Sequence, residues 1–158
     1  MVDRFLLSPL PFAESSIVIS GTITDYQPFL SSDKGSINTE ITVKVEEVFQ
    51  AKPGFSVSKG DSLTIKRLGG SLQLPDGRIV TRTVMGLGKP LQPGRTYVLF
   101  LSRSSLVPRY GVVVAWELRG GRVLPADVSC GPEEEAEFTT LSAELFLQRV
   151  RSESRRAK

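Results

Sequence analysis

Two groups of glutamates are the residues of this sequence best suited to acid–base chemistry. The larger group contains Glu133, Glu134, Glu135 and Glu137, and the smaller group contains Glu46 and Glu47. Paired carboxylates can act as a general acid and a general base, so a carboxylate-only enzyme is one hypothesis. Acidic residues just ahead of a helix are, however, typical of a solvated surface that suits the helix dipole. We therefore predict that both groups are solvated, and we expect no catalytic residues and no enzyme.

The residue counts exclude several other chemistries. The chain contains no histidine, and Cys130 is its single cysteine. Ser-His-Asp and Cys-His catalysis, and zinc sites that use histidine, all require residues that this chain lacks. Cys130 has neither a cationic neighbour nor a nearby predicted helix start, the two features that make a thiol reactive. We expect it to be an inert loop residue, and the sequence predicts no metal site and no cofactor.

The glycine-rich segment of residues 86–89 resembles a phosphate-binding loop in composition but not in spacing. That motif needs a glycine at the position of Thr83 and a serine or threonine at the position of Pro90. Pro90 also has no backbone N–H to donate to a phosphate. The segment is therefore predicted to be a turn between strands.

The elements that must position these residues are mostly β-strands. A strand is expected from residue 16, and Gly21 within it indicates a bend or a close backbone approach. Residues 26–35 have the composition of a loop. Residues 37–45 alternate between apolar and polar side chains, as a half-buried strand does. The alternation slips at Glu46 and Glu47, which predicts a β-bulge there.

The second half of the chain contains the strand that best defines the fold. A hairpin is predicted around the Pro-Asp-Gly turn of residues 75–77. Residues 96–102 are apolar on both faces, so one face should meet the interior of a sheet and the other a covering helix. In the next strand, residues 110–118, we expect Val112, Val114, Trp116 and Leu118 to share one face, with Trp116 in the core.

A chain of 158 residues is expected to form one domain. We predict an irregular lead-in at residues 1–14, a single domain at residues 15–153 and a basic tail at residues 154–158. The domain ends in a helix at about residues 140–154, whose apolar positions recur at helical spacing. The predicted fold is mainly β, a small OB-like barrel or sandwich of six to eight strands with one C-terminal helix.

The net charge of +3 comes from the end of the chain. Residues 149–158 contain five cations and one acid and carry +4, so the remainder carries −1. A binder of single-stranded nucleic acid, the alternative function, needs a basic groove with exposed aromatic side chains. The available aromatic residues are Tyr26, Phe29, Phe49, Tyr97, Tyr110 and Trp116, and the available cations are Lys44, Lys66, Arg67, Arg82 and Arg109. The negative body makes nucleic acid an improbable partner.

Several segments resemble a group of functionally uncharacterised, usually exported bacterial β-barrel proteins that are common in acidobacteria. They are residues 14–23, 41–48, 69–70, 86–90, 94–101 and 117–125. The layout is also distantly similar to OB-like folds of the netrin and tissue-inhibitor-of-metalloproteinase kind, although the chain lacks their disulfides and N-terminal cysteine. The resemblance implies an extracytoplasmic location, whereas residues 1–9 do not match a signal peptide.

These observations favour a non-catalytic module that binds a protein or another surface ligand. No stretch approaches the roughly 18 apolar residues of a membrane span. The sequence does not identify the partner, and it names no residue as part of a site.

Overall fold

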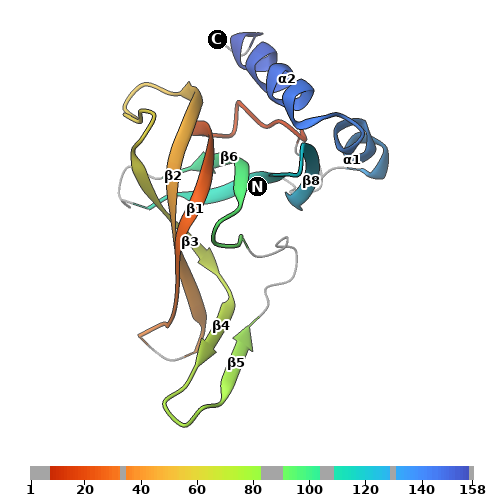
Figure 1. The fold of residues 1–158 in the computed structure, drawn as a ribbon. Helices are drawn as coiled ribbons and strands as arrows, with labels where there is room; N and C mark the ends of the chain where they lie inside the picture. The colour runs from red at the N-terminus through yellow and green to blue at the C-terminus, as the bar shows by residue number, and fades with distance from the viewer. Residues whose placement is uncertain (1–7, 33–34, 83–90, 104–108, 129–130, 157–158) are drawn as a thin grey trace.

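The computed structural model describes residues 8–32, 35–82, 91–103, 109–128 and 131–156 (Figure 1). Eight strands and two helices lie in these ranges. In chain order they are β1 (Ile17–Leu30), β2 (Ile37–Ala51), β3 (Ser62–Leu68), β4 (Gly70–Gln73), β5 (Ile79–Arg82), β6 (Thr96–Ser102), β7 (Gly111–Arg119), β8 (Arg122–Asp127), α1 (Pro132–Thr139) and α2 (Ala143–Arg156). The mainly β fold class is therefore confirmed, with 51% of the described residues in strands.

Six of the strands form one antiparallel sheet in the order β3-β2-β1-β6-β7-β8, and β4 and β5 pair separately. The sheet curls so that its edges approach each other. Next to β7, the Tyr110 N–H donates to the Thr64 carbonyl at 3.1 Å, and the Lys66 N–H donates to the Tyr110 carbonyl at 2.9 Å. These bonds form one isolated parallel bridge between Ile65 and Tyr110. The described strands do not continue it into a ladder, so the sheet is not closed into a barrel.

A buried ion pair on the concave face of the sheet also joins β3 to the end of β8. Arg67 of β3 and Asp127 at the end of β8 are both buried, and their side chains meet at 3.0 Å. Asp127 lies opposite Ala115 and Arg67 lies opposite Thr39, so both project from the concave face. A guanidinium bound to a carboxylate can remain charged inside a protein because each ion offsets the other's lost hydration.

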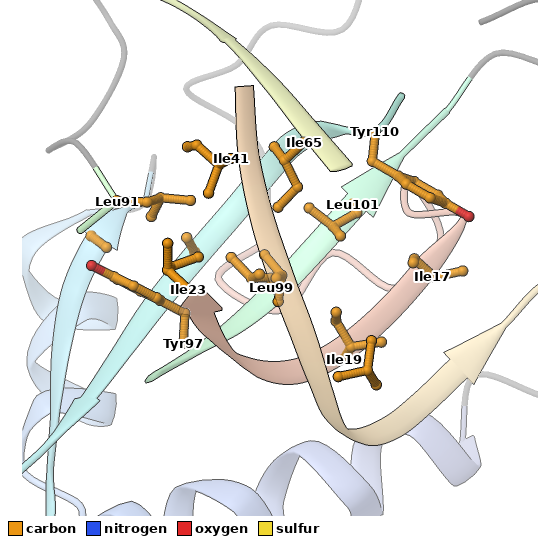
Figure 2. Packing of buried hydrophobic residues seen from close by; sticks show 14 residues of the cluster. Ile17, Ile19, Ile23, Ile41, Ile65, Leu91, Tyr97, Leu99, Leu101 and Tyr110 are labelled. Carbon is orange, nitrogen blue, oxygen red and sulfur yellow. The ribbon is translucent and has the colours of Figure 1, made fainter. Parts of the chain in front are cut away.

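The first apolar cluster fills the concave face of the sheet. Figure 2 shows its side chains converging from β1, β2, β3 and β6. Its buried members include Ile17, Ile19, Ile23, Ile41, Ile65, Leu91, Tyr97, Leu99, Leu101 and Tyr110. Gly21 lies where the backbone of β2 comes close to β1, and a Cβ on it would stand 2.7 Å from the Lys44 carbonyl oxygen. The close backbone approach predicted for Gly21 is thus confirmed.

The second apolar cluster lies on the opposite face, beneath the C-terminal helices. Val98 and Phe100 of β6 and Trp116 of β7 face α2, where Phe146 and Val150 are fully buried. Alternate residues of β6 belong to the two clusters, so the prediction that this strand is buried from both sides is confirmed. Trp116 is a core residue, as expected, and its Nε1–H donates to the Pro9 carbonyl at 3.0 Å.

Two of the β-bulges bear on the side-chain directions predicted from the sequence. Val45 lies opposite Gly21 while Glu47 lies opposite Ser20, which makes Glu46 an extra residue. The bulge predicted at Glu46 and Glu47 is confirmed. In β7, Val113 is the extra residue, because Phe100 pairs with Val114 and Leu101 pairs with Val112. Val112 therefore packs against the concave-face cluster, and the prediction that it shares a face with Trp116 was wrong.

Two other sequence predictions need correction. Residues 26–30 belong to β1 rather than to a loop, since they pair with residues 37–41 of β2 in a long hairpin. The single C-terminal helix is in fact two. The acidic run expected to precede the helix forms α1 itself, with Pro132 in its first turn, where proline is well tolerated. The segment of residues 83–90 and Cys130 lie outside the described residues.

We expect Phe100→Ala to lower the free energy of unfolding by about 3–5 kcal/mol, since it leaves a cavity between Phe12 and α2. Urea denaturation measures the change. The control is Leu145→Ala on α2, whose side chain is 53% exposed and which should change stability by less than about 0.5 kcal/mol. Equal effects of the two variants would contradict burial of β6 from both sides.

We expect Asp127→Ala to cost about 3–5 kcal/mol, because Arg67 is left charged and buried without this carboxylate. The double variant Arg67→Met/Asp127→Leu should recover most of that loss, since apolar groups can replace a buried ion pair. Urea denaturation of the three proteins tests this. A double variant as unstable as Asp127→Ala alone would show that the charge itself is not the cause.

Candidate functional site

The glutamates considered for catalysis do not converge on a common site. Glu133, Glu134 and Glu135 occupy the first turn of α1, where they suit the positive end of the helix dipole. Glu137 accepts a hydrogen bond from Arg149 of α2 at 3.1 Å. Within the described ranges, no group of three or more Cys, Asp or Glu side chains is arranged to hold a metal ion.

Glu46 and Glu47 are adjacent in sequence but have different partners. The exposed Glu46 carboxylate accepts a hydrogen bond from the Thr22 hydroxyl. Glu47 accepts two bonds from Arg151 of α2, each 2.7 Å long. This bidentate pair lowers the pKa of Glu47 below its ordinary value, mainly through the hydrogen bond from Arg151. Glu47 therefore helps to hold α2 on the sheet.

The basic end of the chain is tied to the body of the domain. Arg149 and Arg151 bind Glu137 and Glu47, and the buried Ser154 hydroxyl donates to the Phe49 carbonyl. Helix α2 extends to Arg156, so most of the predicted tail at residues 154–158 belongs to the helix. Residues 157–158 lie outside the description.

The side chains proposed for nucleic-acid binding are largely occupied. Of the six aromatic residues, Phe49, Tyr97, Tyr110 and Trp116 are buried, and Tyr26 and Phe29 are half-buried. Among the cations, Arg67 is buried against Asp127, and Arg109 binds Glu40 at 2.6 Å. Lys44 and Lys66 are exposed. A groove lined by stacking rings and unpaired cations does not emerge from these side chains.

The β4–β5 hairpin is the surface feature that stands out. It extends away from the six-stranded sheet, at the opposite end of the molecule from α2 (Figure 1). Ile79 of β5 is 71% exposed, more than the other exposed large apolar side chains of the described residues. It lies opposite Gln73, beside the Ser71–Thr81 pair whose hydroxyls are 2.8 Å apart. One apolar side chain is thus displayed on an otherwise polar face.

The root of the hairpin is fixed to the β1–β2 end of the sheet. The Gly69 N–H donates to the Ile37 carbonyl at 2.7 Å, and the Thr39 hydroxyl donates to the Gly69 carbonyl at 2.8 Å. Gly70 has a φ of +135°, and a Cβ on it would collide with the Thr39 hydroxyl. Only glycine fits that position without strain, which explains the Gly-Gly pair before β4.

The tip of the hairpin is held by its own hydrogen bonds. Leu74 donates its N–H to the Arg78 carbonyl at 2.7 Å, and Gly77, with a φ of +90°, donates to the Leu74 carbonyl at 2.9 Å. Asp76 accepts from the Arg78 backbone at 3.0 Å and from its Nε at 2.7 Å. Such a turn has little conformational freedom left to lose when it binds.

Comparison of the chain with protein-family models, with curated proteins and with solved structures found no match. No helix in the described part of the chain is long and apolar enough to span a membrane.

Sequence reasoning predicted the hairpin but assigned it no role. The available signal was Ile79 directly after a Pro-Asp-Gly-Arg turn, on the polar face of a short strand. Periodicity cannot distinguish such a residue from one that packs on the sheet, because both fit the same alternation.

We expect Glu47→Gln to destabilise the protein by less than about 1 kcal/mol at neutral pH, because the ion pair is half exposed. The pKa of Glu47 is lowered in the fold. Its contribution is therefore complete above the ordinary carboxyl pKa, and it disappears as the pH falls through the lowered value. Urea denaturation across this range should show wild type and variant converging at acid pH. The exposed Glu14→Gln is the control, and a constant difference between wild type and Glu47→Gln would contradict the assignment.

Proposed function

We propose that this chain is a non-catalytic protein-binding module that contacts its partner through the β4–β5 hairpin. The observation that carries the proposal is the display of Ile79, 71% exposed, on a hairpin fixed at its root and its tip. An exposed apolar side chain on a rigid projection suits insertion into a concave apolar pocket of another protein. The ordering cost of such binding is small because the hairpin is preorganised.

The remaining surface of the described residues supports a protein partner over nucleic acid. Most arginines of the body are paired with carboxylates, including Arg95 with Glu117 at 3.2 Å and Arg109 with Glu40. Neutralising phosphates requires cations that are free to do so. The burial of most aromatic rings also removes the stacking surface on which bases would lie.

The fold supports a finer proposal about architecture, namely an OB-like barrel. Strands β3, β2, β1, β6 and β7 are five consecutive neighbours in the sheet order, and the Ile65–Tyr110 bridge brings its first and last members together. A partly open five-stranded barrel has this form. Kinship with the exported bacterial group named above remains a prediction.

The test begins with a photo-reactive residue placed at position 79 of the full chain. Proteins cross-linked in an extract of the source cells are identified and purified, and their affinities for wild type and variants are measured. We expect Ile79→Asp to weaken binding by about 10- to 100-fold, since burial of an isoleucine contributes about 1.5–3 kcal/mol.

Leu145→Asp is the matched control, because it places the same charge at another exposed apolar side chain, on α2. It should leave the affinity unchanged. If Ile79→Asp binds every cross-linked protein as well as wild type does, or if no cross-linked protein binds the purified chain, the hairpin is not the contact element.

A further inference from the structure

Arg103, just beyond β6, packs against a pair of aromatic rings that also contact each other. Its guanidinium carbon lies 5.2 Å from the centroid of Phe55 and 5.0 Å from the centroid of Tyr110, and the two centroids are 6.4 Å apart. Phe55 comes from the connection between β2 and β3, and Tyr110 immediately precedes β7. The electrostatic attraction between a cation and the faces of aromatic rings holds the guanidinium on this side.

The donors of this guanidinium have no acceptor among the described residues. The Arg103 Nε is buried without a hydrogen-bond partner, and no ion pair to Arg103 is formed by a described carboxylate. Arg67, Arg95, Arg109 and Arg151, which also lie on or beside the sheet, each bind a carboxylate. A buried donor without a partner is costly, and such exceptions are few in native proteins.

Lys52 is a second cation attached to the same part of the sheet as Arg103. The Arg103 N–H donates to the Ser16 hydroxyl at 3.2 Å, and the Lys52 N–H donates to the Ser16 carbonyl at 3.0 Å, so both residues flank the start of β1. The Lys52 ammonium donates to the Ala13 carbonyl, which is a neutral acceptor. Two cations whose backbones bind the same residue favour an anionic ligand over a cationic one.

We propose that Arg103 is a binding site for a carboxylate. A carboxylate can accept two parallel N–H···O bonds from one guanidinium, and this geometry suits an arginine whose position is already held by aromatic rings. The two terminal nitrogens would form the fork, because Nε is buried and out of reach of a ligand. The ligand would supply the negative charge that no described carboxylate supplies.

This site is separate from the hairpin and does not depend on the function proposed for it. Arg103 and Lys52 contact Ser16, just before the first residue of β1, whereas the hairpin is anchored to Ile37 at the far end of the β1–β2 pair. The carboxylate could belong to a small acid or to the C terminus of a peptide. The chemistry recognised is the same in the two cases.

The test follows the Arg103 Nε–Hε signal in ¹H–¹⁵N spectra of the full chain, assigned by its loss in Arg103→Lys. Sodium acetate is titrated against sodium chloride at equal ionic strength, and then a short peptide with a free C terminus against its amidated form. We expect a saturable shift with acetate and none with chloride. A free peptide that binds more tightly than acetate, while its amide does not bind, would identify a chain terminus as the source.

The acetate affinities of four variants test whether acetate binds at Arg103. Calorimetry should show acetate affinity reduced by about 10-fold or more in Arg103→Lys, which cannot form the fork, and by about 2- to 5-fold in Phe55→Leu, which removes one of the two ring contacts. Arg122→Gln, which removes an exposed arginine of β8, and Ile79→Asp should bind acetate as wild type does. Thermal unfolding of each variant verifies that it is folded.

Three results would overturn a binding site at Arg103, and a fourth would overturn the choice of ligand. They are equal shifts with acetate and chloride, an Arg122 signal that moves in parallel with that of Arg103, and undiminished acetate binding by folded Arg103→Lys. Tighter binding of inorganic phosphate than of acetate would reject a carboxylate as the ligand. If the cross-linking test finds no partner for the hairpin while acetate still binds at Arg103, only the proposed function is refuted.

Discussion

Burial of β6 on both faces is the constraint on which the rest of the structure depends. Its inward residues complete the concave-face cluster, and Val98 and Phe100 on the other face need a cover that the sheet cannot provide. Helix α2 supplies that cover with Phe146 and Val150. The ion pair with Glu47 and the Ser154 hydrogen bond then fix its position over β2. The C-terminal helix is therefore an integral part of the core.

The curl of the sheet solves a second problem, the exposure of its edges. Bonds to Tyr110 occupy part of the outer edge of β3, and the Arg67–Asp127 pair draws β3 toward the end of β8. Strand β8 carries Pro125 and an extra residue, Ala126, within its own length. Proline and bulges both prevent a further strand from pairing with an edge. Association through the sheet is thus disfavoured, which leaves the hairpin as the projecting β element.

The sequence predicted much of the fold because binary patterns report burial directly. Residues 37–45 of β2, the two-sided burial of β6 and the Glu46 bulge all produce visible signals in the alternation. Sequence reasoning failed where strand pairing overruled a local rule, as in residues 26–30, where Pro28 and the polar run of residues 31–35 indicated a loop. The face of Val112 was wrong because the bulge at Val113 has no signature among consecutive valines. The contact of Arg103 with the rings of Phe55 and Tyr110 was not predicted, since Phe55 lies far from the other two residues in the sequence.

The bulge at Glu46 has a consequence for how this chain tolerates change in length. Side chains alternate along a regular strand, so unbroken alternation through residues 45–48 would put Glu47 on the concave face with Val45 and turn Val48 outward. The bulge interrupts this alternation once, which directs the Glu47 carboxylate toward α2 and keeps Val48 against the concave-face cluster. If Glu46 were deleted, Glu47 would follow Val45 directly and a regular strand would give both side chains the same directions. Loss of this one residue is therefore compatible with the fold, and it removes only the hydrogen bond from Thr22.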